Sequence, residues 1–174
     1  MRGSFSLTTA ASDEITLRTI QKADCENLRM WKNSNRAAFF FQGIIIPEGQ
    51  RQWFKQYLDR SDDYMFMVVY QNEDIGCMGF RLLDGQVDIY NVILGRREFG
   101  GKGLMGRAMM LMCGYINHSF QCRIRVKALC SNLSAIRWYK KNRFKKVDEN
   151  DKFLKLELAR EKISNDIRIR LKSR

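Results

Sequence analysis

A glycine-rich segment at residues 100–106 constrains the fold of this chain more than any other feature. Four of its seven residues are glycine. An alternating apolar segment precedes it at 86–94, and a segment that is apolar over most of a helical circumference follows it at 104–116. We therefore expect a strand, a loop and a buried helix in succession. Glycines in such a loop let backbone N–H groups point into one concavity at a helix N-terminus, which predicts a phosphate-binding site.

Two common phosphate-binding patterns fit the glycine loop poorly. Gly101, Gly103 and Gly106 match the dinucleotide-binding pattern, but that pattern needs an acidic residue about twenty positions later. Residues 99–147 contain no acidic residue. A P-loop needs Ser or Thr directly after its lysine, and here glycine follows Lys102. A plain tight turn remains an alternative, although the glycines exceed what one turn requires.

Hydrophobic periodicity predicts one mixed α/β domain with an antiparallel meander at its centre. We expect this domain to span 15–160, after a flexible leader at 1–14 and before a basic tail at 161–174. The predicted strands are 15–20, 65–70, 75–82, 86–94, 122–129, 144–147 and 153–158, and the predicted helices are 23–32, one that starts at Pro47, 104–116, and one from Ser131 or Asn132 to Lys141.

The net charge of +12 is concentrated in the acid-free stretch 99–147. A solvated face, a nucleic-acid patch or a site for a small polyanion would each account for it. The chain has no apolar run long enough to span a membrane, and residues 1–13 lack the apolar run of a signal peptide, so we expect a cytoplasmic location. Its five cysteines are scattered without a CxxC pair, so we expect buried thiols and no metal site.

A second motif lies at 132–144, where Ala135 and Tyr139 share one face of a predicted helix. It resembles the pattern N-x-x-A-x-x-x-Y-x-x-x-G-F of the Gcn5-related N-acetyltransferase (GNAT) superfamily, with Arg143 in place of the glycine. The glycine loop is similar to the pyrophosphate loop of that family, Q/R-x-x-G-x-G/A. The resemblance covers roughly 17–147 and implies an α/β (α+β) fold, with a mixed, mostly antiparallel sheet, splayed central strands and helices on both faces.

The resemblance implies that acetyl-CoA is the co-substrate, that it lies in the gap beside the strand 86–94, and that no metal is needed. Tyr139 would protonate the departing thiolate, while a backbone N–H of the splayed strand stabilises the oxyanion. Asp88 and Tyr90 share one face of that strand, where relatives place a base or a residue that holds a water. The implied cofactor contacts are Val92, Ile93, Leu94, Gly100, Gly101, Lys102, Gly103, Leu104, Met105, Gly106, Arg107, Asn132, Ala135 and Lys141.

The residues around Trp31 and Asn33, with 48–54, resemble the acceptor side of two GNAT branches. One branch acetylates nucleotide-linked amino sugars, and the other acetylates the N-termini of ribosomal proteins. We favour the amino sugar, because a second polyanionic substrate suits the positive charge, whereas ribosomal-protein tails are themselves basic. Trp31 and Asn33 would then bind the acceptor, although packing on the sheet explains Trp31 equally well.

The expected partner is therefore a small molecule that carries both an amine and negatively charged groups. We expect no membrane partner, and the sequence leaves open whether the protein forms a homodimer. The alternatives from another class are a non-catalytic GNAT-like module and a basic nucleic-acid-binding module. A nucleic-acid-binding module would interleave aromatic and basic residues on an exposed face. The acid-free stretch is mostly helix and strand core, so nucleic acid is the weaker expectation.

Overall fold

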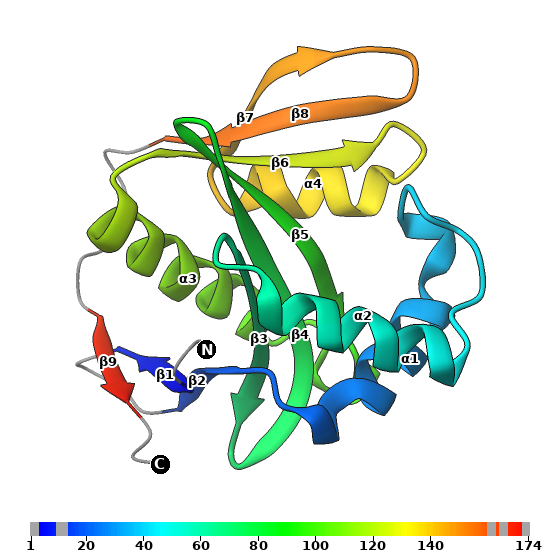
Figure 1. Cartoon of the computed structure of the whole chain (residues 1–174). Coiled ribbons are helices and arrows are strands. Elements are labelled where there is room, and N and C mark those ends of the chain that lie inside the picture. Colours follow the sequence, from blue (N-terminus) through cyan, green and yellow to red (C-terminus); the bar gives the residue numbers. More distant parts are fainter. Residues whose placement is uncertain (1–3, 10–13, 160–162, 164–166, 172–174) are drawn as a thin grey trace.

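The computed structural model describes residues 4–9, 14–159, 163 and 167–171 (Figure 1). The strand order of its sheet is β7-β8-β6-β5-β4-β3-β2-β1-β9. The strands are β1 (Phe5–Thr8), β2 (Ile15–Thr19), β3 (Asp63–Tyr70), β4 (Glu73–Leu83), β5 (Gln86–Leu94), β6 (Arg123–Leu129), β7 (Phe144–Glu149), β8 (Phe153–Leu158) and β9 (Arg168–Leu171). The helices are α1 (Cys25–Ser34), α2 (Pro47–Asp59), α3 (Leu104–Phe120) and α4 (Leu133–Lys141), with short 3-10 turns η1 (Lys22–Asp24), η2 (Arg36–Ala38) and η3 (Arg97–Phe99).

The sheet is mixed but mostly antiparallel, as the sequence predicts. Strands β3, β4 and β5 form the expected meander. Among the described strands, β5 and β6 form the one parallel pair, because α3 carries the chain back across the sheet between them. The predicted fold class is therefore confirmed.

Side-chain alternation in the central strands separates two hydrophobic cores. Phe66 and Val68 of β3 pack with α3 on one face, whereas Met65 and Met67 pack with α1 and α2 on the other. Figure 1 shows α1 and α2 on the near side of the sheet. Helices therefore cover both faces, and α3 is buried around most of its circumference, as its apolar composition predicts.

The strands β1 and β9 extend the sheet beyond the boundaries predicted from the sequence. β1 pairs with β2 on one edge and with β9 on the other, and Leu7 is 0% exposed. The sequence predicts a flexible leader and a basic tail here, and the structure differs because the two segments pair with each other. The remaining leader and tail residues lie outside the described part of the chain, at 1–3, 10–13, 160–162, 164–166 and 172–174.

The central strands β5 and β6 splay apart. Within the described residues, β6 pairs with β5 over Gln86–Ile89, and the pairing stops before Tyr90. On the other side of β5, the register with β4 skips one residue, so that Asn91 and Val92 lie opposite Met78 alone. Asn91 has a φ of 49°. This bulge turns Val92 back toward the α3 face, while Tyr90 packs toward α1 and α2.

None of the described helices is long and apolar enough to cross a membrane.

All five cysteines are free thiols, and Cys77 and Cys113 are buried. Burial raises the pKa of Cys77 to about 12, so this thiol keeps its proton and acts as a small apolar side chain.

Candidate active site

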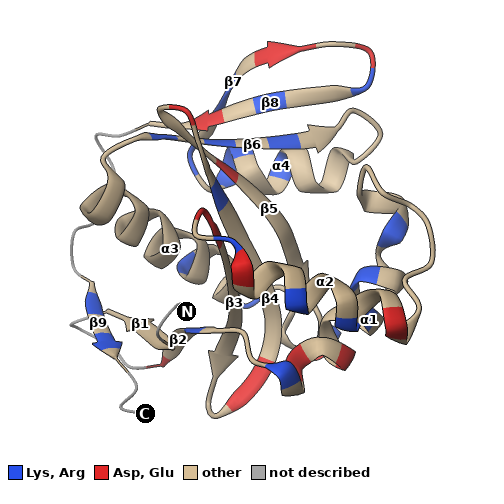
Figure 2. Ribbon diagram, in the orientation of Figure 1, with Lys and Arg blue, Asp and Glu red and all other residues tan. Residues whose placement is uncertain are grey.

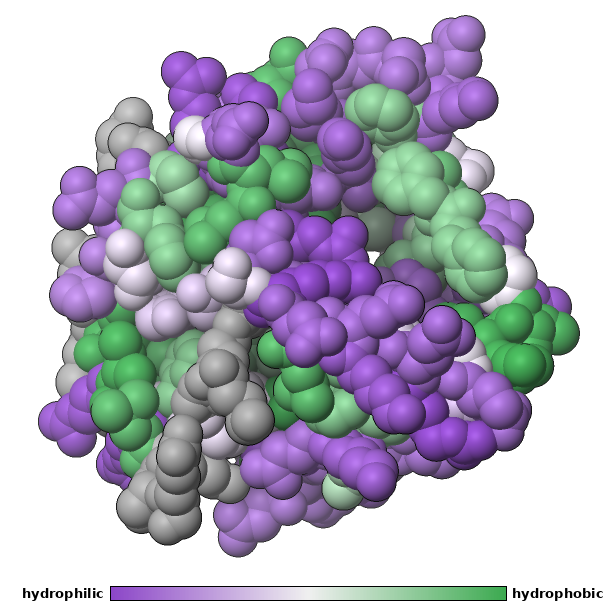
Figure 3. All heavy atoms as spheres, in the orientation of Figure 1, coloured by the Kyte–Doolittle hydropathy of each residue, from purple (hydrophilic) through white to green (hydrophobic). Residues whose placement is uncertain are grey.

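Two cavities meet at the gap between β5 and β6. The larger has a volume of about 1010 Å³ and the smaller a volume of about 490 Å³. Figure 3 shows the surface hollowed in the upper right of the view, beside a run of apolar side chains. A molecule that extends from one cavity into the other passes the residues that line both, which are Ala38, Val92, Asn132, Ala135 and Tyr139.

The glycine loop lines the larger cavity and is shaped to receive an anion. Gly101 and Gly103 have φ values of 76° and 73°, in the left-handed region that favours glycine. A Cβ at either position would meet no atom within 4 Å, so the space above the loop is open. No side chain caps the start of α3, which leaves its first N–H groups available to a ligand. The loop residues that line the cavity are Gly100, Gly101, Gly103, Leu104, Met105, Gly106 and Arg107.

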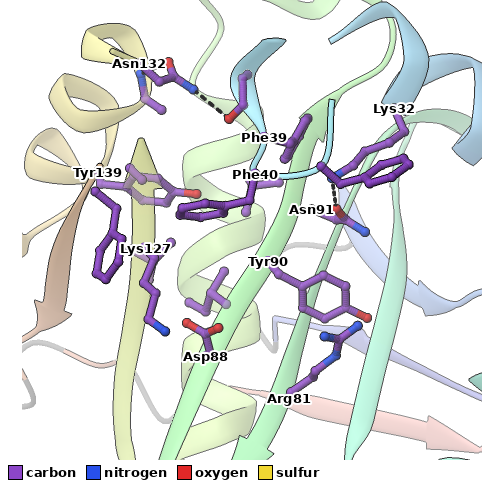
Figure 4. Close-up of a pocket in the computed structure, with 18 residues that line it drawn as sticks. Lys32, Phe39, Phe40, Arg81, Asp88, Tyr90, Asn91, Lys127, Asn132 and Tyr139 are labelled. Atoms are coloured by element: carbon purple, nitrogen blue, oxygen red, sulfur yellow. Dashed lines mark hydrogen bonds between the residues drawn. The ribbon is translucent and has the colours of Figure 1, made fainter. Parts of the chain in front are cut away.

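Helix α4 contributes another part of the wall of the larger cavity, through Ala135, Tyr139 and Lys141. Asn132 begins this helix, because its side-chain oxygen accepts a hydrogen bond from the Ala135 amide at 3.1 Å. The amide nitrogen of the same side chain donates to the carbonyl of Ala38 at 3.4 Å. Asn132 therefore links α4 to η2 where the two cavities meet (Figure 4).

Most of the cofactor contacts expected from the sequence line the larger cavity, but two do not. Val92 and Leu94 line it, whereas the side chain of Ile93 is buried in the core beneath α1 and α2. Lys102 is outside the lining, with its amine 5.1 Å from the centroid of the Phe99 ring. A contact through the backbone of Ile93 stays a prediction.

Tyr139 lies where the two cavities meet. Its side chain is 7% exposed, and its ring packs against Phe144 at a centroid distance of 5.6 Å. No hydrogen bond joins its hydroxyl to another described residue. Burial, followed by the charge of Asp88, raises the pKa of Tyr139 above its usual value. The hydroxyl therefore keeps its proton at neutral pH.

The turn after α4 keeps its shape although its residue type is unusual. Arg143 has a φ of 70°, the conformation that the glycine of the motif would adopt. Its amide donates to the carbonyl of Lys140 at 3.1 Å. The substitution therefore preserves the turn that brings Phe144 against Tyr139.

The smaller cavity carries one acidic and three basic side chains. Figure 4 shows Lys32 and Lys127 on opposite sides of it, with Asp88 beside the amine of Lys127 and Arg81 below Tyr90. Burial raises the pKa of Asp88, while the charges of Lys127 and Arg81 act against this rise. Asp88 therefore holds a proton more readily than a surface carboxylate, which suits a general base.

Lys32 lies on the α1 side of the smaller cavity. Its amine donates a hydrogen bond to the side-chain oxygen of Asn91 and lies 3.2 Å from the centroid of the Phe39 ring. Burial lowers the pKa of Lys32 to about 8. Among the described residues no carboxylate forms an ion pair with this amine, so its charge is available to an anionic ligand.

Tyr90 also lines the smaller cavity, but its hydroxyl has another partner. It donates to Asp63, a fully buried carboxylate that also accepts from Arg60 and Arg81 at 3.0 Å each. Burial, followed by the charge of Asp63, raises the pKa of Tyr90 well above its usual value. Of the two strand residues expected from the sequence, Asp88 is therefore the better candidate for a base.

The two residues expected on the acceptor side, Trp31 and Asn33, line neither cavity. Trp31 is packed in the core against Gly95, where an added Cβ would come within 2.1 Å of the indole ring. Asn33 bonds the backbone of Ile45 twice, at 2.8 and 2.9 Å. Both residues therefore position the neighbouring segments rather than face the cavity.

Several residues of the smaller cavity carry no sequence motif. Lys32, Arg81 and Lys127 come from α1, β4 and β6, and only the folded sheet brings them together. The aromatic run at 39–41 also lines this cavity. Three consecutive phenylalanines outside a predicted strand or helix are the one signal that marks these residues in the sequence.

A family model described as an acetyltransferase (GNAT) domain matches residues 14–145. No curated protein matches the chain significantly.

Solved structures share the fold at low sequence identity. FdhC, a nucleotide-linked sugar GNAT, gives a TM-score of 0.73 at 15% identity, over 87% of this chain and 89% of that one. The ribosomal L7/L12 α-N-protein acetyltransferase RimL, in complex with coenzyme A, gives 0.68 at 16% identity over 92% and 95%. Spermidine N-acetyltransferase from Vibrio cholerae, with CoA and spermine, gives 0.70 at 16% over 84% and 94%. Identities this low support the fold alone.

Proposed function

Because the chain belongs to the GNAT acetyltransferase family, we propose that it transfers the acetyl group of acetyl-CoA to the primary amine of a nucleotide-linked amino sugar. The observation that carries this proposal is the meeting of two cavities at Tyr139, in the gap between β5 and β6. The larger cavity would hold the co-substrate and the smaller one the acceptor.

The residues of the larger cavity fit acetyl-CoA, which supplies an activated acetyl thioester. The loop at 100–106 and the start of α3 offer N–H groups to a pyrophosphate. Arg107 and Lys141 add positive charge for the phosphates. Val92 and Leu94 lie on the part of β5 that β6 leaves unpaired, so their backbone groups can pair with the amides of a pantetheine arm.

The two titratable groups at the junction suit direct attack by an amine. Asp88 removes the proton that the acceptor amine carries, and burial raises its pKa in the direction that favours this transfer. Tyr139 gives a proton to the thiolate that leaves, and the second proton, which the nitrogen gives up as the amide forms, restores the tyrosine. The N–H groups of β5 beyond Ile89 lie beside the gap and can stabilise a developing oxyanion.

The charge of the smaller cavity favours an anionic acceptor. Lys32, Arg81 and Lys127 line it, with Asp88 as the one acidic residue in the lining that the structure describes. Arg81 is paired with the buried Asp63, so the two lysines supply the charge that is open to a ligand. Figure 2 shows further Lys and Arg on β6, β8 and α4, on one side of the gap. A polycationic amine such as spermidine would be repelled, whereas the phosphates of a nucleotide-linked sugar would be attracted.

An N-terminal peptide is the second candidate acceptor. The exposed side chains of Phe41, Ile44 and Ile46 favour it, because they offer an apolar surface beside the cavity. The cations of the cavity oppose it, since ribosomal-protein N-terminal tails are basic. A non-catalytic nucleic-acid-binding module would leave both cavities without a role.

An acceptor screen tests the proposal. The protein is incubated with acetyl-CoA and one of three acceptor classes, namely nucleotide-linked amino sugars, spermidine and N-terminal peptides, and thiol release is followed. We expect acetyl-CoA to raise the melting temperature and only the amino sugars to accelerate thiol release. Thiol release with peptides alone would make an N-terminal peptide the acceptor in place of the amino sugar. If acetyl-CoA does not raise the melting temperature, the larger cavity is not its binding site.

The pH dependence of acceptor binding should report the charge of Lys32. Because its pKa is lowered to about 8, the amine is charged below that pH and neutral above it. We expect the KM for the anionic acceptor to rise several-fold as pH increases from about 7 to about 9. In Lys32→Met the KM should be high at both pH values. Lys55→Met is the control, because Lys55 is exposed on α2 and lies outside the lining of both cavities; the same flattening in that variant would contradict a role for Lys32.

A further inference from the structure

Large aromatic side chains are exposed at the smaller cavity. Phe40 is 58% exposed and Phe41 is 61% exposed, and both line the cavity together with Phe153 of β8. The rings of Phe40 and Phe153 stand edge to face, with centroids 6.0 Å apart and planes at 76°. Aromatic surface left open beside a cavity marks a place where a ligand covers it. We call Phe40, Phe41 and Phe153 the aromatic rim.

The segment that carries Phe40 is held at both ends. Before it, the carbonyl of Ala38 accepts from Asn132, and the ring of Phe39 lies under the amine of Lys32. After it, Ile45 is bonded twice by the side chain of Asn33. The rim is therefore positioned in advance, which lowers the entropy lost when a ligand binds.

Cations lie directly beside the aromatic rim. The amine of Lys127 is 5.5 Å from the centroid of the Phe153 ring. Neither Lys127 nor Lys32 forms an ion pair with a carboxylate of the described residues, whereas Arg81 is bound to Asp63 at 3.0 Å. The charge of Asp88 acts on Lys127 across the cavity, but no salt bridge occupies the amine. Open aromatic faces next to such amines are the combination that binds nucleotides, because bases stack on rings and phosphates pair with amines.

We propose that Phe40, with Phe153 beside it, stacks the nucleobase of the acceptor, and that Lys127 contacts its diphosphate. This inference rests on the proposed function and adds to it the residues that recognise the nucleotide. It distinguishes the amino sugar from an N-terminal peptide, because a peptide offers neither a base for the rim nor phosphates for Lys127. Phe40 is then a specificity-determining residue outside the acetyl-transfer chemistry.

Binding of nucleoside diphosphates tests this proposal without knowledge of the sugar. The protein is saturated with CoA, so that the larger cavity is filled, and uridine, thymidine, cytidine and guanosine diphosphates are titrated calorimetrically. We expect at least one of them to bind, and Phe40→Ala to weaken that binding about tenfold, the loss expected for one base stack. Phe40→Trp should keep the affinity. Lys127→Met should weaken the binding of nucleoside diphosphates more than the binding of the corresponding nucleosides.

Ile44→Ala is the matched control, because Ile44 is 69% exposed on the same segment but lines neither cavity. It should leave the affinity unchanged. The inference is overturned if none of the four diphosphates binds, if Phe40→Ala binds as wild type does, or if Ile44→Ala loses as much as Phe40→Ala. If acetyl-CoA stabilises the protein but no nucleoside diphosphate binds, only the nucleotide site is wrong. If acetyl-CoA does not stabilise the protein either, the proposed function is wrong as well.

Discussion

Tyr139→Phe should lower kcat by roughly a hundredfold to a thousandfold, the range expected when a positioned general acid is removed. The hydroxyl lies where the two cavities meet and bonds no described residue, so its loss removes a proton donor without breaking a hydrogen bond of the fold. Acetyl-CoA should bind as in wild type, because the ring still packs against Phe144. Steady-state thiol release and a titration of acetyl-CoA measure the two quantities.

Tyr70→Phe is the control for the loss of a tyrosine hydroxyl. Tyr70 is half-buried at the end of β3 and lines neither cavity. Its kcat should equal that of wild type. A Tyr139→Phe enzyme with a kcat within twofold of wild type would show that water or another group protonates the thiolate.

Asp63→Asn should lower the free energy of unfolding by about 2–3 kcal/mol. Asp63 is 0% exposed and accepts from Arg60, Arg81 and the hydroxyl of Tyr90. Asparagine carries no charge to offset the two guanidinium groups, and it keeps only one acceptor oxygen. Either the Tyr90 hydroxyl or the two arginines therefore face an amide NH2 in place of an acceptor. Both arginines retain partial access to water, which keeps the loss near the lower end of the range for buried pairs.

The same change should raise the KM for the acceptor, because Arg81 and Tyr90 line the smaller cavity and depend on Asp63 for their position. Chemical denaturation measures the stability, and acceptor kinetics at a temperature where the variant is folded measure the second effect. Asp62→Asn is the control, since that neighbouring side chain is exposed and should cost less than about 0.5 kcal/mol. An Asp63→Asn protein as stable as this control would contradict the role given to the buried carboxylate.

The sequence predicts those parts of the fold that depend on local order. Helix α2 begins at Pro47 and α4 begins after Asn132, because both residue types favour helix starts. The meander follows from alternation and short turns. β1 could not be predicted, because four residues carry little periodic information and their stability comes from β2 and from the distant β9.

The candidate site likewise contains residues that local motifs predict and residues that only the fold brings together. The glycine loop and Tyr139 belong to motifs, and the structure brings both to the larger cavity. The partner of the Tyr90 hydroxyl is not local, since Asp63 belongs to another strand. From the sequence, a packing role and an acceptor-binding role explain Trp31 equally well. The close approach of Gly95 to the indole ring, which only the structure shows, favours packing.

The pairing of β1 with β9 has a consequence for synthesis of the protein. β1 is made early and gains its first neighbour as soon as β2 follows, but its other edge stays open until Arg168–Leu171 has emerged from the ribosome. An open strand edge is a template for pairing with a second chain. Nascent chains are therefore exposed to edge-to-edge association for most of translation, and a stop codon ahead of β9 would make that exposure permanent. Once β9 is in place, Arg168 and Arg170 lie on the new outer strand, where charged side chains discourage a further strand from adding.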